Sequence, residues 1–107
     1  MIRCEIVKKA GRVQRFRIQG HAGFAALGND IVCAAVSVLA TNAINSCEAL
    51  LKVVPDVTEE DGDLICVLNN PDSDEIQLLF ESMVFGLQQM ADEYPRHVEL
   101  KVESLKE

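Results

Sequence analysis

The segment 20–37, GHAGFAALGNDIVCAAVS, contains the residues whose types and spacing favour covalent chemistry. His21 lies among glycines, and Cys33 follows twelve residues later at the start of an apolar run. The thiolate is the reactive form of cysteine, and both a helix N-terminus and a nearby histidine stabilise it. A histidine within hydrogen-bond reach of a thiol can also act as its base. We therefore expect His21 and Cys33 to form a pair of base and nucleophile.

Two polar neighbours could support this pair. Asp30 is a good N-cap residue, and no proline or glycine follows until Pro55, which predicts a helix that ends near Leu51. With Asp30 as the cap, Cys33 is the third helical residue, where unpaired backbone N–H groups and the helix dipole stabilise a negative sulfur. Those N–H groups could also hold the oxyanion formed when a thiolate attacks a carbonyl. Ser37 lies one turn later on the same face.

Asp30 has two interpretations that do not exclude each other. It can cap the helix, or it can orient the histidine as the third residue of a triad does. The cap alone is enough to explain an aspartate at this position.

The remaining cysteines and the second histidine have simpler explanations. Cys4 lies in an alternating strand pattern, Cys66 lies within LICVL, and Cys47 lies on the apolar stripe of the predicted helix. We expect all three to be small buried hydrophobic residues, and we expect His97 to have a structural role. There is no C-x-x-C pair and no sign of secretion, so we expect reduced thiols rather than disulfides.

Two other kinds of site fit the segment less well. Its glycines precede a helix and could cradle a phosphate, but the segment lacks G-x-G-x-x-G, lacks a G-K-[ST] ending and has no basic residue. A zinc site built from His21, Asp30 and Cys33 would need a fourth ligand, and the chain offers no clustered ligand pair. We expect neither a metal nor a cofactor.

Composition limits the class of protein and the kind of partner. The 107 residues are 49% hydrophobic and 25% charged, which is ordinary for one globular domain, here taken as 1–107. The net charge of −7 has the wrong sign for direct nucleic-acid binding and suits a cationic partner. The N-terminus does not resemble a signal peptide, and no apolar run is long enough to suggest a membrane span. We expect a cytoplasmic protein without membrane contact.

The hydropathy pattern predicts five strands and two helices in the order ββ–α–ββ–α–β. A second amphipathic helix starts after Pro71, with Asp72 and Glu75 in capping-box spacing, and stops before Pro95. Asp61-Gly62 predicts a hairpin turn. The predicted strands cover residues 2–7, 13–18, 53–58, 64–68 and 98–103. This order favours an α+β fold of two layers, a mainly antiparallel sheet with both helices on one face.

The first helix carries small or apolar residues on most of its surface. We therefore expect it to be buried on most faces, against a neighbouring helix or a second subunit. One side of the helix contains Val36, Leu39, Ala43, Cys47 and Leu50, and another contains Ala35, Val38, Asn42, Ser46 and Ala49.

Taken together, these residues resemble the bacterial ribosomal-processing cysteine protease (Prp) family. The matching residues are Gly20, His21, Ala22, Gly23, Gly28, and the run DIVCAAVS from Asp30 to Ser37. The resemblance implies a thiol endopeptidase with Cys33 as nucleophile and His21 as general base. It further implies removal of an N-terminal extension, ending in two aromatic residues, from ribosomal protein number twenty-seven of the large subunit, in support of ribosome assembly.

The resemblance also implies a homodimer and a flexible loop over the site, which corresponds to residues 22–29. Phe24 and Leu27 of this loop could close over the aromatic residues of the substrate. The alternative is a non-catalytic ribosome- or protein-binding module, in which the His21 loop docks a partner and Cys33 is dispensable.

Overall fold

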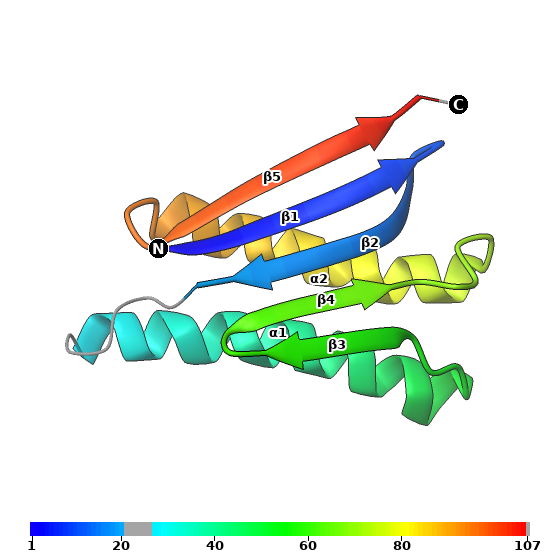
Figure 1. Cartoon of the computed structure of the whole chain (residues 1–107), viewed down its shortest axis with the longest axis horizontal. Coiled ribbons are helices and arrows are strands. Elements are labelled where there is room, and N and C mark those ends of the chain that lie inside the picture. The colour runs from blue at the N-terminus through cyan, green and yellow to red at the C-terminus, as the bar shows by residue number, and fades with distance from the viewer. Residues whose placement is uncertain (21–26, 107) are drawn as a thin grey trace.

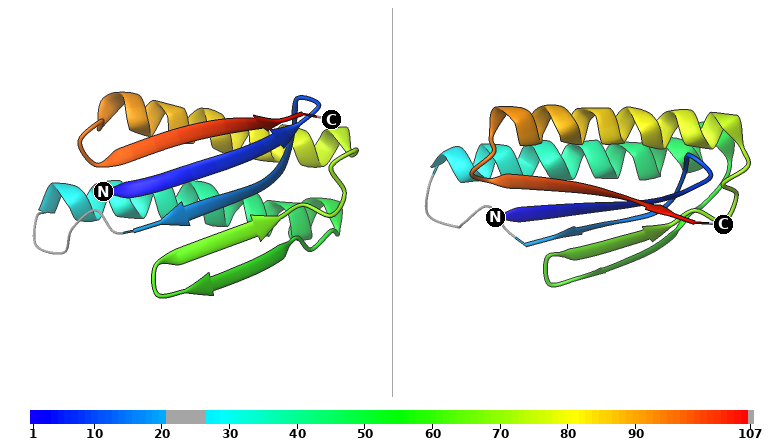
Figure 2. Two further views of the ribbon diagram at one scale, coloured as in Figure 1. Left: turned by 45° about the horizontal axis from the view of Figure 1, so that its top comes forward. Right: turned by 90° about the horizontal axis from the view of Figure 1, so that it is seen from above.

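The computed structural model describes residues 1–20 and 27–106, which form a five-stranded sheet with two helices on one face (Figures 1 and 2). The elements in chain order are β1 (Ile2–Lys9), β2 (Arg12–Gln19), α1 (Leu27–Leu51), β3 (Asp56–Glu60), β4 (Asp63–Val67), α2 (Asp74–Glu93) and β5 (Val98–Leu105). The predicted element order and the α+β class are confirmed.

The sheet has the strand order β3-β4-β2-β1-β5 and is mixed. Three neighbouring pairs are antiparallel, and β5 returns from α2 to pair in parallel with β1. Both hairpin turns contain two consecutive residues with positive φ, namely Ala10 (53°), Gly11 (76°), Asp61 (47°) and Gly62 (77°). This backbone twist matches the twist of the strands, which explains why each turn closes in two residues.

The hydrophobic core lies between the sheet and the helix layer. The rings of Phe16 on β2 and Phe80 on α2 are both fully buried, with centroids 5.8 Å apart. The buried core side chains of α2 are Ile76, Phe80, Met83 and Leu87. They are the spaced apolar positions that the sequence predicts for the second helix.

The start of α2 differs from the prediction by one residue. The N-cap is Ser73 rather than Asp72, and its hydroxyl accepts a hydrogen bond from the backbone N–H of Ile76 at 3.3 Å. Asp74 and Glu75 then occupy the first turn, where acidic side chains complement the positive end of the helix dipole.

The start of α1 also corrects the prediction. The helix begins at Leu27, so Asp30 is its fourth residue rather than its cap, and Cys33 is its seventh. Gly28 does not prevent this extension, because one glycine costs a helix only about 1 kcal/mol and adding residues to an existing helix is favourable.

The expectation that α1 is buried on most faces was wrong for this chain alone. Val36, Ala40, Ala43 and Cys47 are buried, but Val38 is 66% exposed on the opposite side of the helix, and Leu50, beside the buried stripe, is 71% exposed. By length and hydropathy, the segment Ile31–Leu51 could cross a membrane (mean hydropathy 1.4), with 28% of it buried. Its buried side nevertheless belongs to the same core as the sheet and α2, so α1 serves as a core helix with one uncovered side.

Candidate active site

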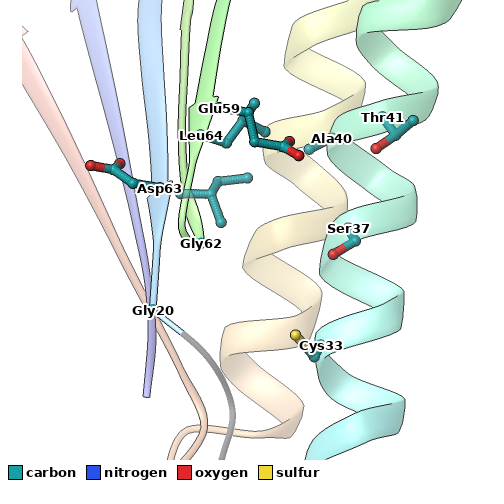
Figure 3. A pocket seen from close by; sticks show the side chains of 10 residues that line it. Gly20, Cys33, Ser37, Ala40, Thr41, Glu59, Gly62, Asp63 and Leu64 are labelled. Atoms are coloured by element: carbon teal, nitrogen blue, oxygen red, sulfur yellow. The ribbon is translucent and has the colours of Figure 1, made fainter.

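A cavity of about 280 Å³ opens between α1, the end of β2 and the β3–β4 hairpin (Figure 3). Its lining residues are Ile18, Gly20, Cys33, Ser37, Ala40, Thr41, Glu59, Gly62, Asp63 and Leu64. Four of them lie on one face of α1 and form one wall of the cavity, namely Cys33, Ser37, Ala40 and Thr41. The opposite wall comes from the sheet.

Cys33 and Ser37 both lie on the wall formed by α1, as the sequence predicts for residues one turn apart. Figure 3 shows the sulfur of Cys33 and the hydroxyl of Ser37 on the side of the helix that faces the sheet. Cys33 is half-buried at the edge of the core. Its side chain packs against core residues and also borders the cavity.

The other three cysteines have a different environment. Cys4, Cys47 and Cys66 are buried in the core, and all four cysteines are free thiols. Burial raises the pKa of the Cys4 and Cys66 thiols to about 12 and raises the pKa of Cys47 as well. Because a buried thiol is hard to ionise and hard to reach, none of these three is suited to nucleophilic attack.

Gly20 anchors the chain at the mouth of the cavity. Its N–H donates to the carbonyl of Gly62 in the β3–β4 turn at 3.1 Å, and its φ is 89°. A side chain here would place Cβ 2.5 Å from the carbonyl oxygen of Met1, so only glycine fits. The peptide bond to His21 therefore starts from a fixed point beside the wall that carries Cys33.

An ion pair adds to the backbone pairing that joins the β3–β4 hairpin to β2. The Arg17 guanidinium donates two hydrogen bonds to the Asp63 carboxylate, at 2.9 and 2.7 Å. The hydrogen bond from Arg17 lowers the pKa of Asp63, and the pKa of Arg17 is raised in return. This bidentate contact helps to fix β4, the strand that borders the cavity.

Several predicted site residues cannot be placed against Cys33. His21, Ala22, Gly23 and Phe24 lie outside the described residues. Leu27, Gly28 and Asp30 form the backbone of the first turn of α1, and their side chains are likewise not described. Among residues 1–20 and 27–106, no group of three His, Cys, Asp or Glu side chains could hold a metal ion.

The register of Cys33 changes the role expected for the helix N-terminus. As the seventh residue of α1, Cys33 lies in the second turn, beyond the first four N–H groups that lack intrahelical partners. The prediction that it occupies the first turn was therefore wrong. Its environment is instead set by the cavity that it lines.

The sequence interpretation missed the wall that comes from the sheet. Glu59, Gly62 and Leu64 belong to the β3–β4 hairpin, some thirty residues beyond Cys33, and border the same cavity. The Asp61-Gly62 turn signal locates the hairpin. Only the strand order shows that this hairpin lies beside α1.

Comparison with known proteins identifies the family. A family model described as Cysteine protease Prp matches residues 1–99. The chain belongs to the Prp cysteine protease family. A curated relative, the ribosomal processing cysteine protease Prp of Staphylococcus aureus (strain Mu50 / ATCC 700699), is 31% identical over 96 residues. That alignment covers 88% of this chain and 91% of the relative, so the resemblance predicted from the motif is confirmed.

Solved structures of similar chains share the fold. The protein SMU.848 from Streptococcus mutans is 32% identical with a TM-score of 0.89, covering 98% of this chain and 96% of that one. The Prp protease of S. aureus, in complex with a covalently linked product peptide, is 29% identical with a TM-score of 0.89. That match covers 96% of this chain and 100% of the Prp chain.

Proposed function

We propose that this chain is a cysteine endopeptidase that removes the N-terminal extension of ribosomal protein number twenty-seven of the large subunit. The observation that carries the proposal is the position of Cys33. Of the four cysteines, all within the described residues, it is the one that lines the cavity. Membership of a family of ribosomal-processing cysteine proteases supports the substrate class. The acidic chain, with net charge −7, also suits a basic ribosomal protein.

In the proposed reaction, the Cys33 sulfur attacks the carbonyl carbon of the scissile peptide bond. His21 takes the thiol proton and passes it to the leaving amine, which releases the mature protein and leaves a thioester on Cys33. Water then attacks the thioester, and His21 takes a proton from the water. The extension leaves as a carboxylic acid, and the proton returns to the Cys33 thiol.

The neighbouring residues have supporting roles in this proposal. The Ser37 hydroxyl, one turn from Cys33 in the same cavity, donates a hydrogen bond to the bound peptide. Asp30 precedes Cys33 by three residues on α1, and we assign it the orientation of His21. Phe24 and Leu27, with the glycines around them, cover the aromatic residues that precede the cut.

We further propose that the protein acts in the cytoplasm and as a homodimer. Reduced thiols are the norm in the cytoplasm, and all four cysteines here are free. The uncovered side of α1 supports the dimer, because no charged residue occurs between Asp30 and Glu48. Such a neutral surface keeps like charges out of the contact between two copies of a chain whose net charge is −7.

The Cys33→Ala variant tests the activity directly. A precursor peptide that spans the extension and the mature N-terminus is incubated with each protein, and the products are identified by mass spectrometry. We expect the wild type to cut after the aromatic pair and Cys33→Ala to leave the peptide intact, because the acyl acceptor is gone. Circular dichroism should show the same fold in both proteins.

Cys47→Ala is the matched control, since it removes a thiol from the core side of the same helix. It should lower stability but retain cleavage. Cleavage by Cys33→Ala would contradict the proposal. Binding of the peptide by both wild type and Cys33→Ala, without turnover by either, would instead support the non-catalytic binding module.

A further inference from the structure

One charged side chain in the cavity has no role in the reaction described above. Glu59 lies on the edge strand β3, opposite Leu64 on β4, which in turn lies opposite Ile18 on β2. Cys4 and Leu100 continue the same row across β1 and β5. Side chains in one such row point to the same face of the sheet, and here that face carries the helices. Glu59 is therefore the one charged residue in an otherwise apolar inward-facing row.

The carboxylate of Glu59 is directed across the cavity towards α1. Figure 3 shows it level with Ala40 and Thr41, while the Cys33 sulfur lies further along the same helix wall. Asp63, also at the cavity, points away from it in the same view. Glu59 is thus placed to meet a side chain of a peptide bound along this wall.

No positive side chain of the described residues pairs with the carboxylate of Glu59. Asp63 is paired with Arg17, but no ion pair or hydrogen bond joins Glu59 to any residue of 1–20 or 27–106. The lining residues that the structure describes include no lysine or arginine. Glu59 is exposed at the open edge of the cavity, and a carboxylate there without a cation attracts a positive group from a ligand.

The distance along the helix sets the position of that positive group. Cys33 and Ala40 are seven residues apart, which is about 10 Å along an α-helix. An extended peptide rises about 3.3 Å per residue, so the same span corresponds to about three substrate residues.

We propose that Glu59 selects a lysine or arginine about three residues from the scissile bond, given the spacing above. The inference rests on the proposed protease function and adds a determinant of its specificity. An inward-pointing charge on an edge strand can also serve to prevent aggregation. That purpose would be met equally well by a positive charge, so charge reversal at Glu59 separates the two explanations.

The experiment measures kcat/KM for peptides that carry two phenylalanines before the cut and neutral residues elsewhere. Lysine or glutamate is placed at the third residue on one side of the bond or the other. For one of these two positions, the wild type should cut the lysine peptide about fivefold faster or more than the matching glutamate peptide. A difference of this size is expected for one charge pair near a protein surface. The ratio should fall as salt is added.

Three variants complete the test, each checked for an unchanged thermal midpoint. Glu59→Gln should abolish the preference, and Glu59→Lys should reverse it towards the glutamate peptide. Glu60→Lys is the matched control, because Glu60 is the next residue of β3 and its side chain lies on the opposite face of the sheet. It should retain the wild-type preference.

The results separate this inference from the function on which it rests. If the wild type cuts the lysine and glutamate peptides equally, or if Glu59→Lys keeps the wild-type preference, the role of Glu59 is refuted while the protease assignment stands. If the wild type cuts none of the peptides, the proposed function fails and the inference fails with it.

Discussion

At the scale of single residues, the same side chain has different chemistry according to its surroundings. Cys33 is half-buried beside a cavity, whereas Cys4, Cys47 and Cys66 are enclosed in the core. Desolvation disfavours the thiolate of an enclosed cysteine, because the charge loses its hydration without gaining a partner. Reactivity should therefore be confined to one of the four thiols.

Alkylation of the native protein with iodoacetamide tests this expectation. At pH 8, a thiol whose pKa is about 12 is ionised in about one molecule in ten thousand. Cys4 and Cys66 both have such a pKa, so they should react far more slowly than Cys33, and their rates should keep rising with pH well above pH 9. Peptide mass spectrometry after timed alkylation measures all four rates.

Denatured protein provides the control for the alkylation experiment, since all four thiols should then react at similar rates. Equal rates in the native protein would show that Cys33 is as inaccessible as the others. That result would count against its role as nucleophile.

At the scale of elements, the contact between α2 and β2 depends on one buried side chain. The register between β1 and β2 shifts at Val7/Lys8, which leaves Gln14 without a partner on β1. Next to this bulge, the Gln77 amide oxygen accepts from the N–H of Val13 and its NH₂ group donates to the Val13 carbonyl, both at 2.8 Å. Gln77 thus satisfies two buried backbone groups and fixes α2 on the sheet.

Gln77→Leu should lower the free energy of unfolding by about 2–4 kcal/mol, because both backbone groups of Val13 lose their partner inside the core. Urea unfolding followed by circular dichroism measures the loss. Gln89→Leu is the matched control on the same helix, and as an exposed substitution it should change stability by about 0.5 kcal/mol or less. A similar loss in both variants would mean that the Gln77 contact contributes little.

At the scale of the whole molecule, the two helices leave an apolar surface uncovered. Val38 on α1 is 66% exposed and Phe85 on α2 is 68% exposed, and Ile31 and Leu78 are similarly open. Gly86 lets the helices approach closely, since a Cβ there would lie 2.7 Å from Leu39 Cδ2. Large apolar side chains exposed together on two neighbouring helices are typical of an interface, and the proposed homodimer would bury them.

Light scattering coupled to size-exclusion chromatography tests the dimer. The wild type should elute with twice the 11.8 kDa mass of the chain, and Phe85→Asp should elute as a monomer, because a charge would be buried without a partner. Leu105→Asp, at an exposed apolar residue on β5, is the control and should leave the mass unchanged. A monomeric wild type at micromolar concentration would refute the homodimer.

Local patterns in the sequence predicted most of the fold. Alternation, the Asp61-Gly62 turn and the spaced apolar residues of α2 depend only on neighbouring residues, so all of these elements were found. Both helix starts were misplaced, at Leu27 rather than after Asp30 and with Ser73 rather than Asp72 as the cap. A cap is a small local preference, and helix extension or an adjacent serine can outweigh it.

The sequence alone determined the family and the strand and helix order, and it proposed Cys33 as the nucleophile, because residue type and short-range spacing express these directly. Only the tertiary structure decided what surrounds Cys33. Strand pairing brings Gly62 against Gly20 and places Glu59 across the cavity from α1, between segments that are far apart in the chain. The tertiary structure also showed that one side of α1 is uncovered. The sequence could not show this, because hydropathy indicates how apolar a helix is but not which of its faces pack against another element.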